Sequence, residues 1–238
     1  MPDSLLYWKG CMSRLRTRSI SDSTMELFRR MGVEFETLGE KEGCCGSVLL
    51  RTGHVGAAKK VAEATVGRIS SRGFREVVTA CPGCFRTMTS EYPVLLGGVP
   101  FRVRHISQFL VEKRPMLEGR LGRMDLKACY HDPCHLGRHM GVYEEPRELI
   151  RMVPGIELIE MGDSRARSLC CGSGGGVRSA YPDLSREVAR TVARDQMPNG
   201  VSLLVTACPF CNYNFRDACS GRIRVVDLPE LLLSAWRG

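Results

Sequence analysis

The residues with the clearest chemical potential in this chain of 238 residues are its 12 cysteines. Ten of them form two sets of five, in which a single cysteine, an adjacent pair and a C-x-x-C pair follow in the same order. The sets are Cys11, Cys44, Cys45, Cys81 and Cys84, and Cys134, Cys170, Cys171, Cys208 and Cys211. Cys129 and Cys219 have no counterpart in the other copy of the pattern. So many thiols in a reducing compartment indicate metal or redox chemistry rather than structural disulfides.

Three kinds of chemistry use thiols at such spacings. Two C-x-x-C pairs could supply the four ligands of a structural zinc site, but each set carries a fifth thiol. The stretch "TACPGCF" follows a predicted strand and opens a helix, as in dithiol redox proteins, although this leaves the doublets unexplained. Iron–sulfur clusters take thiolate ligands and nearby N–H donors. A cubane cluster takes four cysteines, so the fifth thiol indicates an additional, bridging ligand.

Three glycines are candidates for binding such a cofactor. Gly46 and Gly172 each follow a cysteine doublet, where a missing side chain would let the backbone approach a cluster. Gly174 belongs to the run "GSGGG", which follows the second doublet rather than a strand. A cluster cradle explains this run better than a dinucleotide site does.

The chain repeats itself. The blocks "LLYWKGC", "EGCCGSV" and "VVTACPGC" return as "ACYHDPC", "SLCCGSG" and "LVTACPFC". The offset is 123 residues from Cys11 to Cys134 and 127 residues from Cys81 to Cys208. This repeat predicts two tandem domains, an N-terminal one over 1–116 and a C-terminal one over 117–238. The break falls near the charged stretch "KRPMLEGRLGRMDLK".

Each copy alternates short apolar runs with helical patterns. We expect strands over 4–10, 33–38, 75–80 and 101–106 and helices over 19–32, 55–73 and from 84. In the second copy we expect strands over 125–131, 156–161, 201–207 and 223–228 and helices over 146–153 and 183–197. The alternation predicts an α/β fold made of two tandem, Rossmann-like units with mostly parallel sheets, related by pseudo-two-fold symmetry.

This arrangement places four cysteines at functional positions. Cys11, Cys81, Cys134 and Cys208 follow the C-terminal ends of predicted strands, where open parallel sheets bind ligands. Helix N-termini at that edge present free N–H groups and a dipole that favours anions, including thiolate and sulfide.

The net charge of +8 comes mainly from arginine. The arginines are scattered and no nucleic-acid module is recognisable, so an acidic partner or an anionic substrate is favoured over nucleic acid. No apolar run approaches the ~18 residues that span a bilayer. The N-terminus does not have the pattern of a signal peptide. We expect a cytoplasmic protein without direct membrane insertion, whose attachment to a membrane, if any, is made through a partner protein.

The complete pattern, C-x32-CCG-x34-C-x2-C followed by C-x35-CCG-x35-C-x2-C, resembles the cysteine-rich "CCG domain" family. The stretches "YHDPCHLGRHMGVYEEPRELI" and "SLCCGSGGG" are similar to the catalytic subunits, of B or D type, of heterodisulfide reductases. The resemblance covers nearly the whole chain. It implies that each set of five cysteines holds one noncubane [4Fe–4S] cluster.

The resemblance also implies an activity and partners. A small anionic disulfide, in methanogens the mixed disulfide of coenzymes M and B, is reduced to two thiols between the clusters. The chain lacks the run C-x2-C-x2-C-x3-C-P, so electrons are expected from a ferredoxin-like subunit of C type and a flavoprotein subunit of A type beyond it. The alternative is an iron–sulfur electron-transfer subunit in the oxidation of a 2-hydroxy acid or glycerol 3-phosphate.

Histidine and arginine supply the remaining candidates. His131, His135 and His139 are four residues apart, but Pro133 and Gly137 make one continuous helix there unfavourable. His135, beside Cys134, is the candidate donor of a hydrogen bond or proton to a departing thiolate. Further candidates for contact with an anionic substrate are Arg138 and Arg178.

Overall fold

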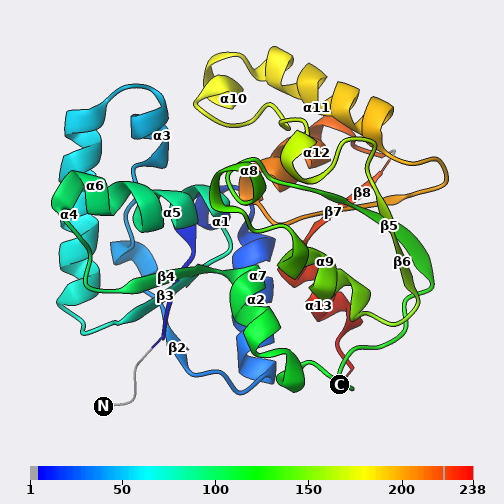
Figure 1. The fold of residues 1–238 in the computed structure, drawn as a ribbon, viewed down its shortest axis with the longest axis horizontal. Coiled ribbons are helices and arrows are strands. Elements are labelled where there is room, and N and C mark those ends of the chain that lie inside the picture. Colours follow the sequence, from blue (N-terminus) through cyan, green and yellow to red (C-terminus); the bar gives the residue numbers. More distant parts are fainter. Residues whose placement is uncertain (1–4, 222, 238) are drawn as a thin grey trace.

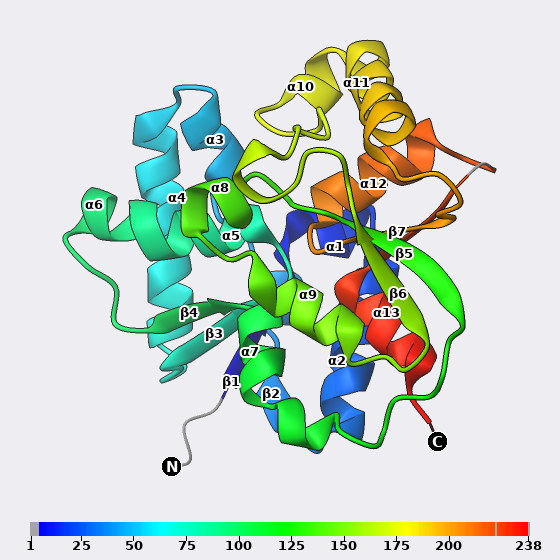
Figure 2. The same cartoon turned by 45° about the vertical axis from the view of Figure 1, so that its right-hand side comes forward.

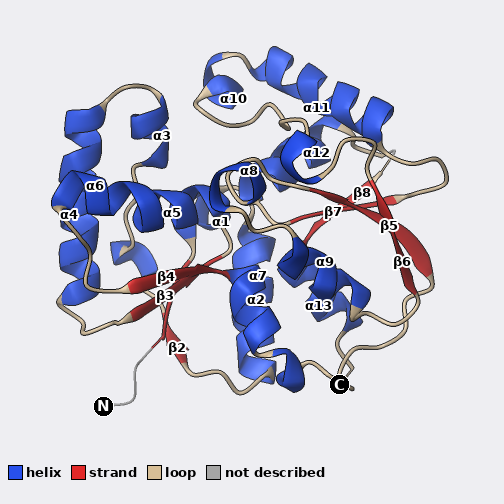
Figure 3. Cartoon of the chain, viewed as in Figure 1, coloured by secondary structure: helices blue, strands red, loops and turns tan. Residues whose placement is uncertain are grey.

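The structure, a computed structural model, describes residues 5–221 and 223–237. Within these ranges it contains two four-stranded sheets in which every neighbouring pair is parallel, shown separately in Figure 3. The first sheet consists of β1 (Leu5–Trp8), β2 (Phe35–Glu36), β3 (Glu76–Thr79) and β4 (Arg102–His105). The second consists of β5 (Leu126–His131), β6 (Ile156–Glu160), β7 (Leu203–Thr206) and β8 (Arg224–Asp227). The predicted α/β class is confirmed.

The two sheets have the same topology and register. The strand order is β2-β1-β3-β4 in the first and β6-β5-β7-β8 in the second. Tyr7 pairs with Val78 in the first sheet, and Tyr130 pairs with Val205 at the corresponding place in the second. The chain is therefore built from two similar repeats, as the sequence predicted.

Helices connect the strands in both repeats. The first repeat contains α1 (Gly10–Leu15), α2 (Arg18–Arg30), η1 (Gly39–Lys41), α3 (Ser47–Arg51), α4 (Val55–Ser70), α5 (Pro82–Arg86), the π-helical turn η2 (Thr87–Glu91), α6 (Tyr92–Leu96) and α7 (Ile106–Glu112). The second contains α8 (Gly137–Met140), α9 (Glu144–Arg151), η4 (Arg165–Arg167), α10 (Val177–Ala180), α11 (Pro182–Gln196), α12 (Pro209–Ala218) and α13 (Leu228–Ala235). The helices predicted over 19–32, 55–73 and 183–197 correspond to α2, α4 and α11.

Local sequence explains the helices that carry the site. Pro82 and Pro209 occupy the first position of α5 and α12, where a missing N–H has no helical partner to lose. The residues before them, Cys81 and Cys208, are extended N-cap residues at the ends of the preceding loops. Each C-x-x-C pair therefore has one cysteine at the mouth of a helix and the other in its first turn.

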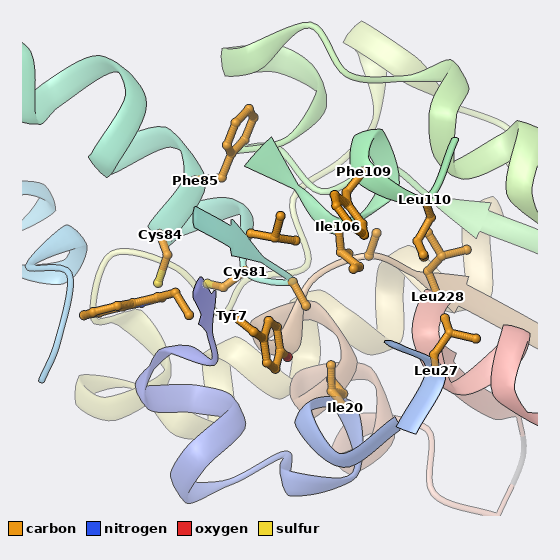
Figure 4. Packing of buried hydrophobic residues seen from close by; sticks show 14 of the residues in the cluster. Tyr7, Ile20, Leu27, Cys81, Cys84, Phe85, Ile106, Phe109, Leu110 and Leu228 are labelled. Carbon is orange, nitrogen blue, oxygen red and sulfur yellow. The ribbon is translucent and has the colours of Figure 1, made fainter. Parts of the chain in front are cut away.

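The C-terminal helix of each repeat packs on the first long helix of the other. Contacts join α13 to α2 and α7 to α9. In Figures 1 and 2 these four helices lie between the two sheets. Figure 4 shows part of the buried cluster, which includes Leu27 from α2, Phe109 from α7 and Leu228 from α13. This exchange of helices brings the corresponding ends of the two sheets toward each other.

The sheets lie on either side of the predicted domain boundary at residues 116 and 117, joined by a segment that includes η3 (Arg114–Met116). One buried apolar cluster takes residues from both repeats, so they share a core. The boundary of the two predicted domains stays a prediction. Their outermost residues, and the first four residues used to judge a signal peptide, lie outside the described ranges. Within those ranges no helix has the length and apolar character needed to cross a membrane.

Candidate metal centre

The single cysteines and the C-x-x-C pairs lie just beyond the C-terminal ends of the central strands. Cys11 lies in α1, which follows β1, and Cys134 lies in the loop after β5. Cys81 follows β3 and Cys208 follows β7. The predicted placement of these four residues is confirmed. The doublets lie in loops between η1 and α3 and between η4 and α10.

Within each set the five thiols form a connected series in the same order. In the first repeat, side-chain hydrogen bonds join Cys11 to Cys44, Cys44 to Cys45, Cys45 to Cys84 and Cys84 to Cys81. In the second they join Cys134 to Cys170, Cys170 to Cys171, Cys171 to Cys211 and Cys211 to Cys208. The fold thus gathers thiols that are far apart in the sequence.

The first cysteine of each doublet has the greatest thiolate character. Hydrogen bonds from Cys11 and then Cys45 lower the pKa of Cys44. Hydrogen bonds from the corresponding pair in the second repeat lower the pKa of Cys170. The thiolate is the form of cysteine that binds metals.

All ten cysteines line one cavity of about 690 Å³ between the repeats. Its other lining residues are Ser47, Val48, Arg51, Gly83, Pro133, His135, Gly174, Gly175 and Phe210. The packing of α2 on α13 and of α7 on α9 gives the two sets this common space. A molecule in the cavity would lie beside sulfur atoms from both repeats.

The glycines after the doublets support the sulfur atoms, by a route different from the one expected. The N–H of Gly46 donates to Cys44 Sγ and the N–H of Gly172 donates to Cys170 Sγ, each at 3.4 Å. Both glycines have positive φ, 78° and 81°. A Cβ on Gly172 would lie 2.8 Å from Cβ of Val188 on α11, so glycine is needed for helix packing and turn geometry rather than for room in the cavity. Gly174 lines the cavity.

Two further glycines belong to the site and were missed. A Cβ on Gly10 would lie 3.2 Å from Cys84 Sγ. A Cβ on Gly83 would lie 3.7 Å from Cys81 Sγ and 3.8 Å from His135 Nδ1. Both sites keep space open beside sulfur atoms. The available signal was the position of each glycine directly before a cysteine, in "KGC" and "PGC".

The three histidines lie on different elements, so the prediction against one continuous helix is confirmed. His131 ends β5 and its Nε2 is 3.0 Å from the carbonyl oxygen of Leu169. His135 lies in the following loop and lines the cavity, and its buried Nδ1 has no hydrogen-bond partner among the described residues. His139 lies on α8, with its ring centroid 5.4 Å from that of His135.

The two arginines expected near an anionic substrate have protein partners. Arg138 donates to the backbone carbonyls of Ala166 and Ser168, which fixes the loop before the second doublet. Arg178 pairs with Asp217. Neither belongs to the described lining of the cavity, and their contact with a substrate stays a prediction.

A buried ion-pair network supports the second cysteine set. Arg147 on α9 is fully buried, and its guanidinium donates to both carboxylate oxygens of Asp132 at 2.7 Å and to both of Glu160 at 2.8 Å. Asp132 also accepts the N–H of Arg165 at 2.8 Å, and its carbonyl accepts from Ser168 Oγ at 3.1 Å. The network ties the end of β5 to the loop before the second doublet. Sequence reasoning missed it because the partners lie on different elements.

Glu42 has a similar role in the first repeat. Its carboxylate accepts the N–H of Lys9 at 2.9 Å and that of Gly10 at 2.8 Å, and Arg14 donates to its carbonyl at 3.1 Å. Burial raises the pKa of Glu42 to about 7. These bonds hold the loop before the first doublet against α1, which carries Cys11.

The donor set fits an iron–sulfur group in each repeat. Among the described residues, no group of three or more His, Cys, Asp or Glu side chains is arranged to hold a single metal ion. The thiols are arranged instead as two connected series of five along the cavity wall. Thiolates are the usual ligands of iron–sulfur clusters, and N–H donors beside the sulfur atoms support such sites.

Fold and site together define a duplicated α/β protein with one cysteine set in each repeat. The chain belongs to the family described as the cysteine-rich domain, CCG, whose model matches residues 5–89 and 128–216. The family assignment made from the sequence is thus confirmed, with one match in each repeat.

Several named proteins are similar to the chain. It is 38% identical to the D-type component of the dihydromethanophenazine:CoB–CoM heterodisulfide reductase of Methanosarcina acetivorans, over 98% of this chain and 59% of the relative. It is 31% identical to the B-type component of the fumarate reductase (CoM/CoB) of Methanothermobacter marburgensis, over 97% of this chain and 46% of the relative. With the EtfAB:quinone oxidoreductase of Syntrophomonas wolfei the identity is 28%, over 97% and 34%. The chain thus spans only part of each relative's length.

Among solved structures, the aspartate racemase of Picrophilus torridus matches with a TM-score of 0.43 and 13% identity, covering 98% of this chain and 92% of that one.

Proposed function

We propose that this chain is the iron–sulfur catalytic subunit of a heterodisulfide reductase-like complex, and that it reduces a disulfide to two thiols in the cavity between its repeats. The observation that carries the proposal is the common cavity, which both five-cysteine sets line. Similarity to the heterodisulfide reductase component of Methanosarcina acetivorans supports it.

Each set would hold one noncubane [4Fe–4S] cluster through its five cysteines. The sets contain five thiols each in equivalent series, one more than a cubane cluster needs. When bound, the clusters would supply the electrons of the reaction one at a time. Reduction takes up two electrons and two protons, breaks one S–S bond and forms two S–H bonds.

The chain's own residues would orient the disulfide and supply a proton. Val48, Pro133 and Phe210 give the cavity apolar wall, which displaces water from the reacting sulfur atoms. His135 lines the same cavity, and we propose that it donates a hydrogen bond or proton to a departing thiolate. Its unpartnered, buried Nδ1 supports this role.

The electrons would come from a ferredoxin-like subunit of C type, with a flavoprotein subunit of A type beyond it. Similarity to a relative that is itself named as one component of a reductase supports an assembly of this kind. The protein is proposed to act in the cytoplasm, with any membrane attachment made by a partner.

Anaerobic turnover tests the proposal. Protein loaded with iron and sulfide is mixed with reduced methyl viologen and a panel of disulfides, and the released thiols are quantified by chromatography. Two thiols are expected for each disulfide consumed. Electron paramagnetic resonance of the oxidised, thiol-treated protein then reports whether thiols bind at the metal centre. A His135→Ala variant with full iron content and unchanged turnover would remove the proposed proton donor.

Electron transfer alone, within a system that oxidises a 2-hydroxy acid or glycerol 3-phosphate, is the second candidate. Similarity to the quinone oxidoreductase of Syntrophomonas wolfei favours it. In that case the loaded protein would accept and return electrons in stopped-flow measurements but would consume no disulfide.

A further inference from the structure

Among the described residues that line the cavity, Arg51 is the one that carries a permanent charge. It is the last residue of α3, the short helix that begins directly after the first doublet and Gly46. The other lining residues are cysteines, glycines and Ser47, Val48, Pro133, His135 and Phe210. The Arg51 side chain is 22% exposed, so its charge is only partly screened by water.

The surroundings of Arg51 leave positive charge in excess. Its Nη2 pairs with Glu91 of η2, and Nε of Arg86 lies 3.2 Å from the same carboxylate oxygen. The other oxygen of Glu91 accepts from Thr87 Oγ1 at 3.0 Å. Two guanidinium groups thus share one carboxylate. In the described part of the chain, Glu91 is the recorded partner of Arg51, which leaves Nε and Nη1 of Arg51 available to a ligand.

This positive charge faces the second repeat across the cavity. Burial, followed by the charges of Arg86, His139 and Arg51, lowers the pKa of His135 to about 4. The same two arginines act on His139 of α8. The charge therefore acts on residues at the junction of the repeats rather than only on outer solvent.

The second repeat does not supply a matching charge. Where the first repeat has Gly83 in "ACPGC", the second has Phe210 in "ACPFC", and both residues line the cavity. Arg178 follows the second doublet as Arg51 follows the first, but it pairs with Asp217 and lies outside the described lining. The cavity is thus open and cationic on one side and apolar on the other.

We infer that Arg51, supported by Arg86, forms an anion subsite on the first-repeat side of the cavity, which binds an acidic group carried by one thiol fragment of the disulfide. The planar guanidinium suits carboxylate, sulfonate and phosphate groups alike. The fragment beside Phe210 is correspondingly uncharged near its sulfur atom. This inference rests on the proposed disulfide reduction and specifies the substrate class and its orientation.

The test compares two probes of nearly equal shape, 3,3′-dithiodipropionate and its neutral diamide, with reduced methyl viologen as donor. Arg51→Gln is expected to raise KM for the dianion by about 10-fold or more, with kcat and both constants for the diamide unchanged, because a charge-assisted bond formed equally in ground and transition states is lost. Glu91→Gln is expected to lower KM for the dianion, since it removes the competing carboxylate. Arg51→Lys should restore part of the affinity.

Arg29→Gln serves as the matched control, because Arg29 is an exposed residue of α2 that pairs only with Glu26 among the described residues and loses the same charge. A role of Arg51 in folding alone would raise KM for both probes, or move the Glu91 and Arg51 variants in the same direction, and either result overturns the subsite.

Calorimetry separates this inference from the proposed function. The probes are 3-mercaptopropionate and 3-mercaptopropionamide, added to the oxidised, cluster-loaded protein. Preference for the anion that disappears in Arg51→Gln supports the subsite even if the wild type reduces neither disulfide, a result that would end the proposed function alone. Equal binding of both thiols by the wild type overturns the subsite.

Discussion

Cys44 and Cys170 line one cavity from opposite repeats of the chain. The sulfur atom of each accepts the N–H of the glycine two residues later, at 3.4 Å in both repeats. Each also receives hydrogen bonds from the single cysteine and from the second cysteine of its own set. Duplication has thus placed two equivalent thiol series beside the same volume, which is the arrangement that a substrate with two sulfur atoms needs.

Loss of one doublet cysteine should empty one repeat only. Because the two series have no cysteine in common, Cys44→Ala is expected to reduce iron and acid-labile sulfide from about eight to about four of each per chain. Cys170→Ala should have the same effect. Metal analysis of anaerobically purified protein gives the numbers, and electron paramagnetic resonance shows which signal is lost.

Cys129→Ala is the control for this experiment. Cys129 is buried on β5 and belongs to the second apolar cluster rather than to the cavity wall. Its replacement should leave the iron content unchanged. Loss of all the iron in Cys44→Ala would contradict independent series.

The glycines after the doublets should differ in their tolerance of a side chain. A Cβ on Gly172 would lie 2.8 Å from Cβ of Val188, whereas one on Gly46 would lie 3.4 Å from Cγ1 of Val61. Both substitutions carry the cost of positive φ, about 1–2 kcal/mol. Gly172→Ala should therefore destabilise by about 1–3 kcal/mol more than Gly46→Ala, the range for overpacking. Urea unfolding measures the difference. Adding Val188→Ala should recover part of it, and equal costs would count against the packing explanation.

The buried pair of Arg147 and Asp132 should be costly to break. Arg147→Met leaves a carboxylate that is 2% exposed without its partner, so we expect a loss of about 3–5 kcal/mol in the free energy of unfolding. Lys127→Met, which breaks an exposed pair with Glu157, should cost less than about 1 kcal/mol. Chemical denaturation of both variants provides the comparison. Similar small losses in the two would show that Arg147 is not a structural anchor of the site.

The pH dependence of stability should carry the signature of His105. Burial lowers the pKa of His105, the N-cap residue of α7, to about 3, against about 6.5 in the unfolded chain. Below pH ~6.5 the unfolded state binds the extra proton, so this contribution to stability is present near neutral pH and is lost as the pH falls. The slope approaches about 1.4 kcal/mol per pH unit.

His105→Asn tests this directly, because Asn retains an N-cap acceptor but does not titrate. The difference in unfolding free energy between wild type and variant, measured from pH 7 to pH 5, cancels the contributions that the two proteins share. A difference that stays constant with pH would show that His105 is protonated in the folded protein.

Much of the fold could be predicted because its signals are local or repeated. Strand–helix alternation and the recurrence of Tyr7 as Tyr130 within matching blocks indicated the α/β class and the duplication. The helices α1, α3, α8 and α10 have only four to six residues, too few turns for periodicity to reveal them. Spacing before cysteines could place four of the ten thiols at strand ends but could not show that both sets share one cavity.

The missing parts of the site depend on contacts between distant segments. Glu42 reaches the backbone of Gly10, 32 positions away, and Arg51 pairs with Glu91, 40 positions away. Arg138 seemed a reasonable anion contact beside the second cysteine set, yet its donors turn to carbonyl groups of its own repeat. Sequence alone identifies an arginine as a cation; only packing decides whether a carboxylate, a carbonyl or a ligand receives its hydrogen bonds.

The most direct test of the shared cavity is anaerobic disulfide turnover in the single-set variants, with iron measured in the same samples. Wild type with about eight iron atoms should release two thiols per disulfide, whereas Cys44→Ala and Cys170→Ala, each with about four, should both lose turnover although one set is intact. If either variant retained wild-type turnover for each molecule of protein, the two sets would not act together on one disulfide, and the account would be wrong.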